Sequence, residues 1–312
     1  MWVRKVGSAP KKGLFERGPL SPVGQTPLLC VHSGPGLSSR YMETIEFLGL
    51  YRQVAFYDQS GCGNSSAVNG GSTPGARTLQ ASVDELAAVA AALAGDRKGN
   101  PGGRVHVLGH GLGGMLALEA VAQGKLSPAS LTLVGTPLSY GDLVADRRAC
   151  LELLPAGDAR ALREADAADA LVTGEGGRTF RGAQAAPEFA RYAQSHLARR
   201  SRSGCLTFAS GDCEAGVYDV TGGRYFEEAG TARGWSAAGR LAGAAGVPAL
   251  LVRGTRDELS RESVDRLQAE LGPGAQRMEM ENAGSAVFVD DWEVFLERVK
   301  EHCDAADESG AA

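Results

Sequence analysis

The sequence has no long apolar run and no paired cysteine motif. Among its 312 residues, no stretch of the roughly 18 apolar residues needed for a membrane-spanning helix occurs, and the amino end lacks the apolar core of a secretory signal. The six cysteines are scattered, without a CxxC pair. This usage predicts reduced thiols in a cytoplasmic protein that binds no metal and no cofactor, with a Cys205–Cys213 disulfide as the alternative.

The sequence also has no stripe of basic residues. It carries 32 Lys and Arg against 37 Asp and Glu, a formal net charge of −5. Because a phosphate backbone is bound mainly through clustered positive charge, this balance argues against a nucleic-acid partner. A hydrophobic fraction of 43% with 22% charged residues is typical of a globular protein.

Short apolar segments alternate with segments of helical periodicity. The expected strands cover residues 3–6, 27–31, 53–57, 104–108, 131–134 and 249–252. Helical spacing of apolar residues marks 79–93, the segment after 112, and 288–302. Such short runs, bounded by Gly, Pro or Asp, suit a parallel sheet covered on both faces, so the sequence predicts an α/β fold.

The strand signal disappears between residues 137 and 240. That stretch is rich in Ala, Arg and Glu with helical spacing. We therefore expect a helical cap at 137–240, inserted between strands of a core formed by 1–136 and 241–304. Residues 305–312 are polar and are expected to form a frayed tail.

One segment has the form of a catalytic turn but lacks its nucleophile. A strand, a sharp glycine turn and a helix are the context of the nucleophile elbow G-x-S-x-G. Residues 109–113 read Gly-His-Gly-Leu-Gly, so the frame is present and the serine is absent.

Four segments together resemble a known family. They are 32–36 (HSGPG), 57–63 (YDQSGCG), 108–117 around the elbow, and 251–258 (LVRGTRDE). In order and spacing they are similar to the proline iminopeptidase family of α/β hydrolases, of the tricorn-associated aminopeptidase type. The resemblance implies an α/β-hydrolase fold: a mostly parallel central sheet with helices on both faces and a helical cap. Residues 3–6 then match the family's second strand, so the amino end looks short.

The resemblance also places the family's catalytic machinery. The nucleophile position is Gly111, the acid is retained as Asp257, and the histidine position falls on Ser285. The oxyanion donors would be the backbone N–H groups of Gly34 and Leu112. Backbone donors survive the loss of side chains, so a ligand site can persist without catalysis.

Three more residues complete the candidate ligand site. His32 and Ser33 open the oxyanion loop, where Ser33 replaces a family glycine. Tyr225 stands where the family's cap carries a glutamate that receives the substrate's amino group. A peptide-amine substrate is therefore in doubt.

These substitutions predict a protein that is silent as a serine hydrolase. Acyl transfer requires a nucleophile, a base and an orienting acid, and losing triad members costs on the order of 10⁶ in turnover. We expect a small-molecule or peptide ligand in the pocket under the cap, or a protein partner. The alternatives are a hydrolase with relocated groups, using Ser33 or His110, and a cofactor-free lyase, isomerase or cyclase.

Overall fold

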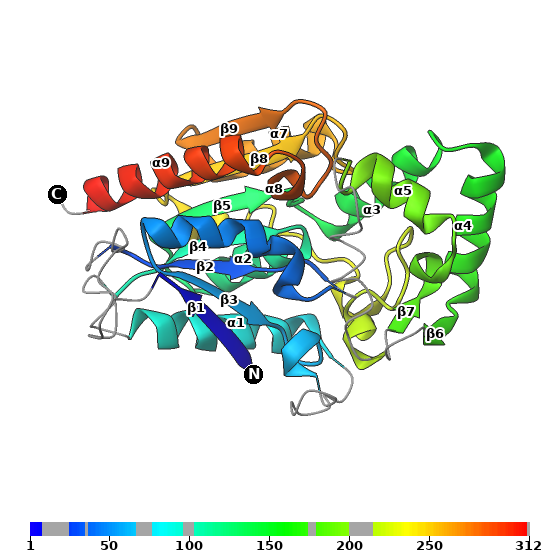
Figure 1. Cartoon of the computed structure of the whole chain (residues 1–312), viewed down its shortest axis with the longest axis horizontal. Coiled ribbons are helices and arrows are strands. Elements are labelled where there is room, and N and C mark those ends of the chain that lie inside the picture. The colour runs from blue at the N-terminus through cyan, green and yellow to red at the C-terminus, as the bar shows by residue number, and fades with distance from the viewer. Residues whose placement is uncertain are drawn as a thin grey trace, which may run out of the picture.

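The central element is a seven-stranded, mostly parallel sheet (Figure 1). The computed structural model describes residues 1–7, 25–34, 37–66, 77–95, 103–173, 179–199 and 215–310; Cys205 and Cys213 lie outside these ranges. The strands are β1 (Trp2–Val6), β2 (Leu28–Val31), β3 (Val54–Asp58), β4 (His106–His110), β5 (Ser130–Val134), β8 (Ala249–Gly254) and β9 (Ala275–Met280). Their order is β1-β3-β2-β4-β5-β8-β9, and only the edge strand β1 is antiparallel.

Helices cover both faces of this sheet. One face packs on α1 (Leu79–Ala94), α2 (Leu112–Ala122) and α7 (Arg261–Leu271). The other packs on the 3₁₀ helix η1 (Ser39–Leu50), α8 (Val287–Asp290) and α9 (Trp292–Gly310). Since side chains alternate across a strand, strands buried on both faces must be apolar throughout, as β2 is with Leu28, Leu29, Cys30 and Val31 all fully buried. The predicted α/β architecture is confirmed.

The insertion between β5 and β8 contains the cap elements. They are α3 (Tyr140–Leu151), α4 (Ala156–Ala168), β6 (Leu171–Thr173), β7 (Thr179–Arg181), η5 (Gly182–Ala185), α5 (Phe189–His196), η6 (Ala215–Val220) and η7 (Gly230–Ala232). The 3₁₀ helix that follows them, η8 (Leu241–Ala244), packs on α2 in the core. In Figure 1 the cap segment lies beyond the carboxyl ends of the central strands. No pattern in the sequence indicated β6 and β7, which pair as an antiparallel hairpin within this mostly helical stretch.

The carboxyl-terminal helix is longer than the sequence indicated. We expected a frayed tail from residue 305, but α9 continues to Gly310. Its last turns are held because Ala306 is buried and Asp307 pairs with Arg52, 255 residues away. Of the helices in the described ranges, α9 included, none is long and apolar enough to cross a membrane.

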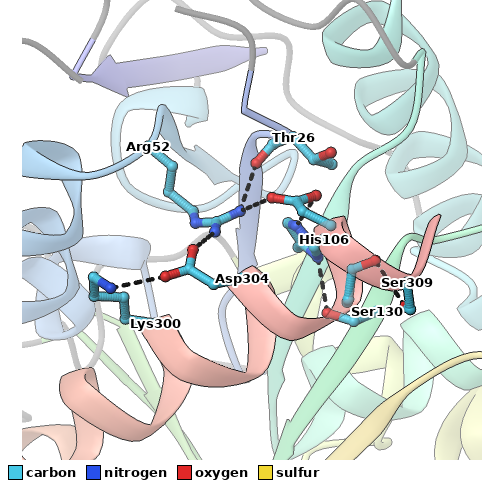
Figure 2. Close-up of polar contacts among 9 residues, drawn as sticks. Thr26, Arg52, His106, Ser130, Lys300, Asp304 and Ser309 are labelled. Atoms are coloured by element: carbon cyan, nitrogen blue, oxygen red, sulfur yellow. Dashed lines mark hydrogen bonds and ion pairs between the residues drawn. The ribbon is translucent and has the colours of Figure 1, made fainter. Parts of the chain in front are cut away.

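Arg52 lies at the centre of a polar cluster under α9 (Figure 2). Its side chain is only 1% exposed, and it donates to the Thr26 carbonyl and to the carboxylates of Asp304 and Asp307. Asp307 also contacts His106 Nε2 at 3.1 Å. The other ring nitrogen of His106 contacts Ser130 Oγ at 2.8 Å. The cluster therefore ties α9 to the amino ends of β2, β3, β4 and β5.

Candidate functional site

The turn between β4 and α2 has the shape of a nucleophile elbow. Gly111 is the residue before α2 and has φ 51° and ψ −117°, a conformation that strains any residue with a side chain. A Cβ on Gly113 would stand 2.3 Å from the Val31 carbonyl oxygen, so only glycine allows α2 to begin this close to β2. The glycine frame thus keeps the elbow although no serine is present.

The Ser33 hydroxyl occupies the space that a side chain at position 111 would need. A Cβ built on Gly111 would lie 2.7 Å from Ser33 Oγ. The same oxygen lies 3.4 Å from the backbone nitrogen of Leu112, one of the expected oxyanion donors. The backbone N–H of Ser33 donates to Tyr41 OH at 2.8 Å, which fixes this serine in place. The Ser33 hydroxyl therefore fills the space between position 111 and the Leu112 nitrogen.

Asp257 follows β8, is buried, and forms no ion pair with any residue in the described ranges. Its Oδ1 accepts the Leu259 N–H at 3.0 Å, whereas Oδ2 has no aligned hydrogen-bond partner among the described residues. Burial raises the pKa of Asp257 to about 7, although the Leu259 N–H and the neighbouring Ser285 hydroxyl act to lower it. The charge of the adjacent Glu258 also raises this pKa, and the charge of Arg253 lowers it.

His110, the last residue of β4, contacts Ser285, the position at which the resemblance led us to look for a histidine. Its Nε2 lies 3.0 Å from Ser285 Oγ, and its Nδ1 lies 2.7 Å from Tyr41 OH. Burial lowers the pKa of His110 to about 4, so the ring is neutral at physiological pH. The contacts form a continuous chain from the Ser33 N–H through Tyr41 and His110 to Ser285.

The cap side of the site is built around a buried ion pair. Glu258 Oε1 accepts from Arg147 Nε at 3.0 Å and from Nη2 at 2.8 Å. Its Oε2 accepts from the hydroxyls of Tyr192, at 3.2 Å, and Tyr225, at 2.8 Å. The Arg147 guanidinium also lies 3.9 Å from the centre of the Tyr225 ring. Four hydrogen bonds therefore engage both oxygens of this carboxylate.

A cavity of about 230 Å³ lies between the elbow and the cap. Its wall is mostly apolar, with Phe180, Pro187, Phe189, Leu197 and several alanines. The polar groups that reach it are Ser33, His110, Arg147, Gln184, Tyr225, Glu258 and Ser285. A cavity of this composition suits a small, largely apolar molecule.

The structure brings most of the predicted site residues together. Ser33, Gly34, Gly111, Tyr225 and Ser285 all line the cavity.

Three other predicted residues do not line the cavity. Leu112 reaches Ser33 through its backbone, and Asp257 lies near Ser285, since a Cβ on Gly135 would meet both side chains. His32 is fully buried, with Nε2 accepting the Gln59 N–H and Nδ1 against the Ser33 carbonyl. It therefore shapes the loop.

The sequence reasoning missed Arg147, Tyr41 and the role of Glu258. Arg147 is one of many arginines in the cap and carried no distinguishing signal. Glu258 directly follows the retained acid, which could have drawn attention to it. Among the described residues, no group of three or more His, Cys, Asp or Glu side chains is arranged to hold a metal ion.

Comparison with known proteins identifies the family to which this fold belongs. The alpha/beta hydrolase family matches residues 28–298. Proline iminopeptidase of Lactobacillus delbrueckii subsp. lactis is 33% identical over 145 residues, 46% of this chain and 47% of that protein. The corresponding enzyme of Lactobacillus crispatus is 41% identical over 96 residues, 30% of each chain. The matched regions thus span about half or less of these relatives.

Solved structures extend the likeness of fold to nearly the whole chain. Proline iminopeptidase of Mycobacterium smegmatis superposes with a TM-score of 0.73 at 22% identity, covering 99% of this chain and 96% of that one. VinJ superposes with a TM-score of 0.75 at 21% identity, covering 98% and 95%. At these identities the likeness concerns the fold alone. With most of its length matched by the family pattern, the chain belongs to the alpha/beta hydrolase family.

Proposed function

We propose that this protein is a non-hydrolytic member of the family that holds a small, uncharged, largely apolar ligand under its cap. The observation that carries the proposal is the position of Ser33. Its hydroxyl stands 2.7 Å from the site of a Cβ on Gly111 and 3.4 Å from the Leu112 nitrogen. The Ser33 side chain thus occupies the space that a nucleophile at position 111 would need and the space that a substrate oxyanion would need.

The surrounding hydrogen bonds support an inactive arrangement. In the proposed arrangement, Tyr41 OH accepts the Ser33 N–H and donates to His110 Nδ1, which puts the proton of His110 on Nε2, facing Ser285. A histidine that donates to a serine cannot remove that serine's proton. No base among the described residues hydrogen-bonds to Ser33 Oγ. Neither serine is therefore activated.

The ion pair at the cap supports an uncharged ligand. A substrate ammonium would need free carboxylate lone pairs, but both oxygens of Glu258 are already engaged by Arg147, Tyr192 and Tyr225. Replacing those buried bonds would leave Arg147 without its counter-ion, which is costly in a cavity of low dielectric. The apolar walls favour an acyl or aryl group instead.

Rebuilding the triad tests the catalytic part of the proposal. Gly111→Ser alone would collide with Ser33, so the rebuilt protein carries Ser33→Gly, Gly111→Ser and Ser285→His together. We expect no fluorophosphonate labelling of the wild type or of Gly111→Ser, and labelling with measurable hydrolysis of a small chromogenic ester for the triple variant. Wild-type hydrolysis far above the roughly 10³-fold over water that binding alone can leave would refute the silent assignment.

A matched pair of probes tests the ligand class. N-acetyl-phenylalaninamide is neutral, whereas phenylalaninamide carries an ammonium group. We expect the neutral probe to raise the melting temperature of the wild type and the charged one not to. Arg147→Met frees the Glu258 carboxylate and should shift the preference toward the charged probe. Equal stabilisation of the wild type by both probes would contradict the proposal.

A second candidate is a relocated hydrolytic pair, and the 3.0 Å contact between His110 Nε2 and Ser285 Oγ favours it. It requires the opposite tautomer, with Nε2 free to accept the serine proton and Tyr41 accepting from Nδ1. Ser285→Ala would then abolish ester hydrolysis while Ser33→Ala would not. Under our proposal neither variant changes the background rate.

A further inference from the structure

A second hollow, of about 560 Å³, lies on the α9 face of the molecule, away from the cap. We call it the η1–α9 groove; its lining is Phe47, Leu48, Leu50, Tyr51, Trp292, Glu293, Leu296, Glu297, Lys300 and Glu301. Large apolar side chains in it are unusually exposed: Phe47 by 49%, Leu50 by 50%, Tyr51 by 45% and Trp292 by 37%. Contiguous exposed apolar residues in a hollow mark an interaction site more often than isolated ones do.

The exposed aromatic residues form an ordered apolar floor. The rings of Phe47 and Trp292 are stacked, with centroids 5.1 Å apart. Lys300 Nζ lies 5.2 Å from the centre of the Tyr51 ring and pairs with Asp304 at 2.8 Å. The one lysine of the groove is therefore already engaged, and the floor is left to apolar contacts.

The rim of the groove on α9 is acidic. Glu293, Glu297 and Glu301 follow one another at single-turn spacing, and all three are exposed. Glu301 pairs with Arg298 at 3.1 Å, but Glu293 and Glu297 make no ion pair with any residue that the structure describes. Like charges one turn apart destabilise a helix, so this row opposes helix stability while giving the groove a negative edge.

We propose that the η1–α9 groove binds an amphipathic helix of another protein, with an apolar stripe flanked by lysine or arginine. The apolar floor matches the stripe of such a helix, and the acidic rim matches its flanking charges, as in other helix-in-groove interactions. A second copy of this chain fits less well, because a two-fold axis through the groove would bring the two rows of glutamates together.

Two synthetic peptides with the full-length protein test the proposal. Both are 18-residue helices with leucines at helical spacing, one flanked by lysines and the other by glutamates. Anisotropy of a label on the peptide should report binding of the lysine peptide, with a change in Trp292 emission, and at least tenfold weaker binding of the glutamate peptide. Glu293→Lys with Glu297→Lys should reverse this preference. Glu308→Lys, farther along the same helix, is the matched control and should leave it unchanged.

Other outcomes would overturn the proposal. They are equal binding of both peptides or of neither, binding of phosphatidylcholine vesicles through the same residues, and self-association in sedimentation that Phe47→Ser abolishes. Shielding of Trp292 from acrylamide quenching in the free protein would also overturn it, because the chain itself would then cover the groove. Phe47 is half exposed, so the Phe47→Ser variant should still fold. The circular dichroism and melting temperature of this variant separate a loss of binding from a loss of folding.

Discussion

The two histidines of β4 lie at opposite ends of one strand and in opposite electrostatic settings. His106 begins the strand and contacts Asp307, whose carboxylate also binds Arg52 (Figure 2). His110 ends the strand between two hydroxyl groups, Tyr41 and Ser285. At the amino end of the sheet, the buried Arg52 pairs with the partly exposed Asp304 and Asp307. At the carboxyl end, Asp257 is buried with no ion pair to a described residue, next to the Arg147–Glu258 pair.

This difference separates a stabilising cluster from a buried carboxyl that has no counter-ion among the described residues. Two buried opposite charges satisfy one another, whereas a lone buried carboxyl keeps its proton to a higher pH. Accordingly, the pKa of Asp307 is lowered to about 2, since hydrogen bonds from His106 and Thr26 and the charge of Arg52 outweigh the effect of burial. The pKa of Asp257 is raised to about 7 by burial.

The largest effect is expected from removing the cation of the paired cluster. Arg52→Met keeps most of the buried volume but leaves Asp304 and Asp307 without their counter-ion. We expect a loss of about 3 kcal/mol in the free energy of unfolding, measured by urea denaturation. Arg4→Met is the control: Arg4 pairs with Glu46 at the surface, and its loss should cost less than about 1 kcal/mol. Equal losses would contradict a special role for the buried cluster.

The second-largest effect on stability is expected from removing the charge of the buried Asp257 carboxyl. Because the pKa of Asp257 is higher in the folded protein than in the unfolded chain, its contribution to stability falls as the pH rises from about 4 to about 7. Asp257→Asn removes this dependence and can still accept the Leu259 N–H. We expect the variant to be more stable than the wild type by about 2–3 kcal/mol at pH 8 and equal to it near pH 4. A constant difference at both pH values would show that titration is not responsible.

A smaller effect on stability is expected from adding a side chain at the elbow residue, Gly111. Gly111→Ala introduces a side chain at positive φ and 2.7 Å from Ser33 Oγ. We expect a loss of about 2 kcal/mol in the free energy of unfolding. Adding Ser33→Gly should recover only the part due to the collision, because the backbone strain remains. Full recovery in the double variant would mean that the turn itself is unstrained.

The smallest effect on stability is expected from removing the Asp307 carboxylate, and this effect should disappear at acid pH. Since the folded-state pKa of Asp307 lies below its unfolded value, its contribution is present above about pH 4 and is lost as the pH falls toward 2. Asp307 is partly exposed, so we expect Asp307→Asn to cost only about 1 kcal/mol at pH 7 and nothing at pH 2. Unfolding curves across this range check the prediction. A cost that persists at pH 2 would point to packing instead of charge.

The sequence predicted the inner strands, the elbow and the edge strand β1, but not β9 at the opposite edge of the sheet. Strands β2, β4 and β5 are buried on both faces, so they are short apolar runs that local composition reveals. Strand β9 was not located, because at the edge it reads Ala-Gln-Arg-Met-Glu-Met and only its two ends are buried. The β6–β7 hairpin was missed since its strands have three residues each.

The resemblance predicted several residues of the candidate site, but it did not predict which residues they contact. The resemblance placed Gly111, Asp257 and Ser285, because each occupies a fixed position in a motif. It did not indicate that Ser33 fills the space beside Gly111 or that Glu258 is engaged by Arg147, 111 residues away. Contacts between distant segments depend on how the cap packs on the core, and no local pattern of residues records that packing.

The closure of α9 on Arg52 has a consequence for synthesis of the chain. Arg52 is translated 252 residues before Asp304 and 255 before Asp307, so during elongation its guanidinium has neither carboxylate to bind. Contacts of such sequence separation form late, because the loop must close before they stabilise anything. Arg52 can therefore pair with these carboxylates only after α9 has been synthesised, when every strand of the sheet already exists.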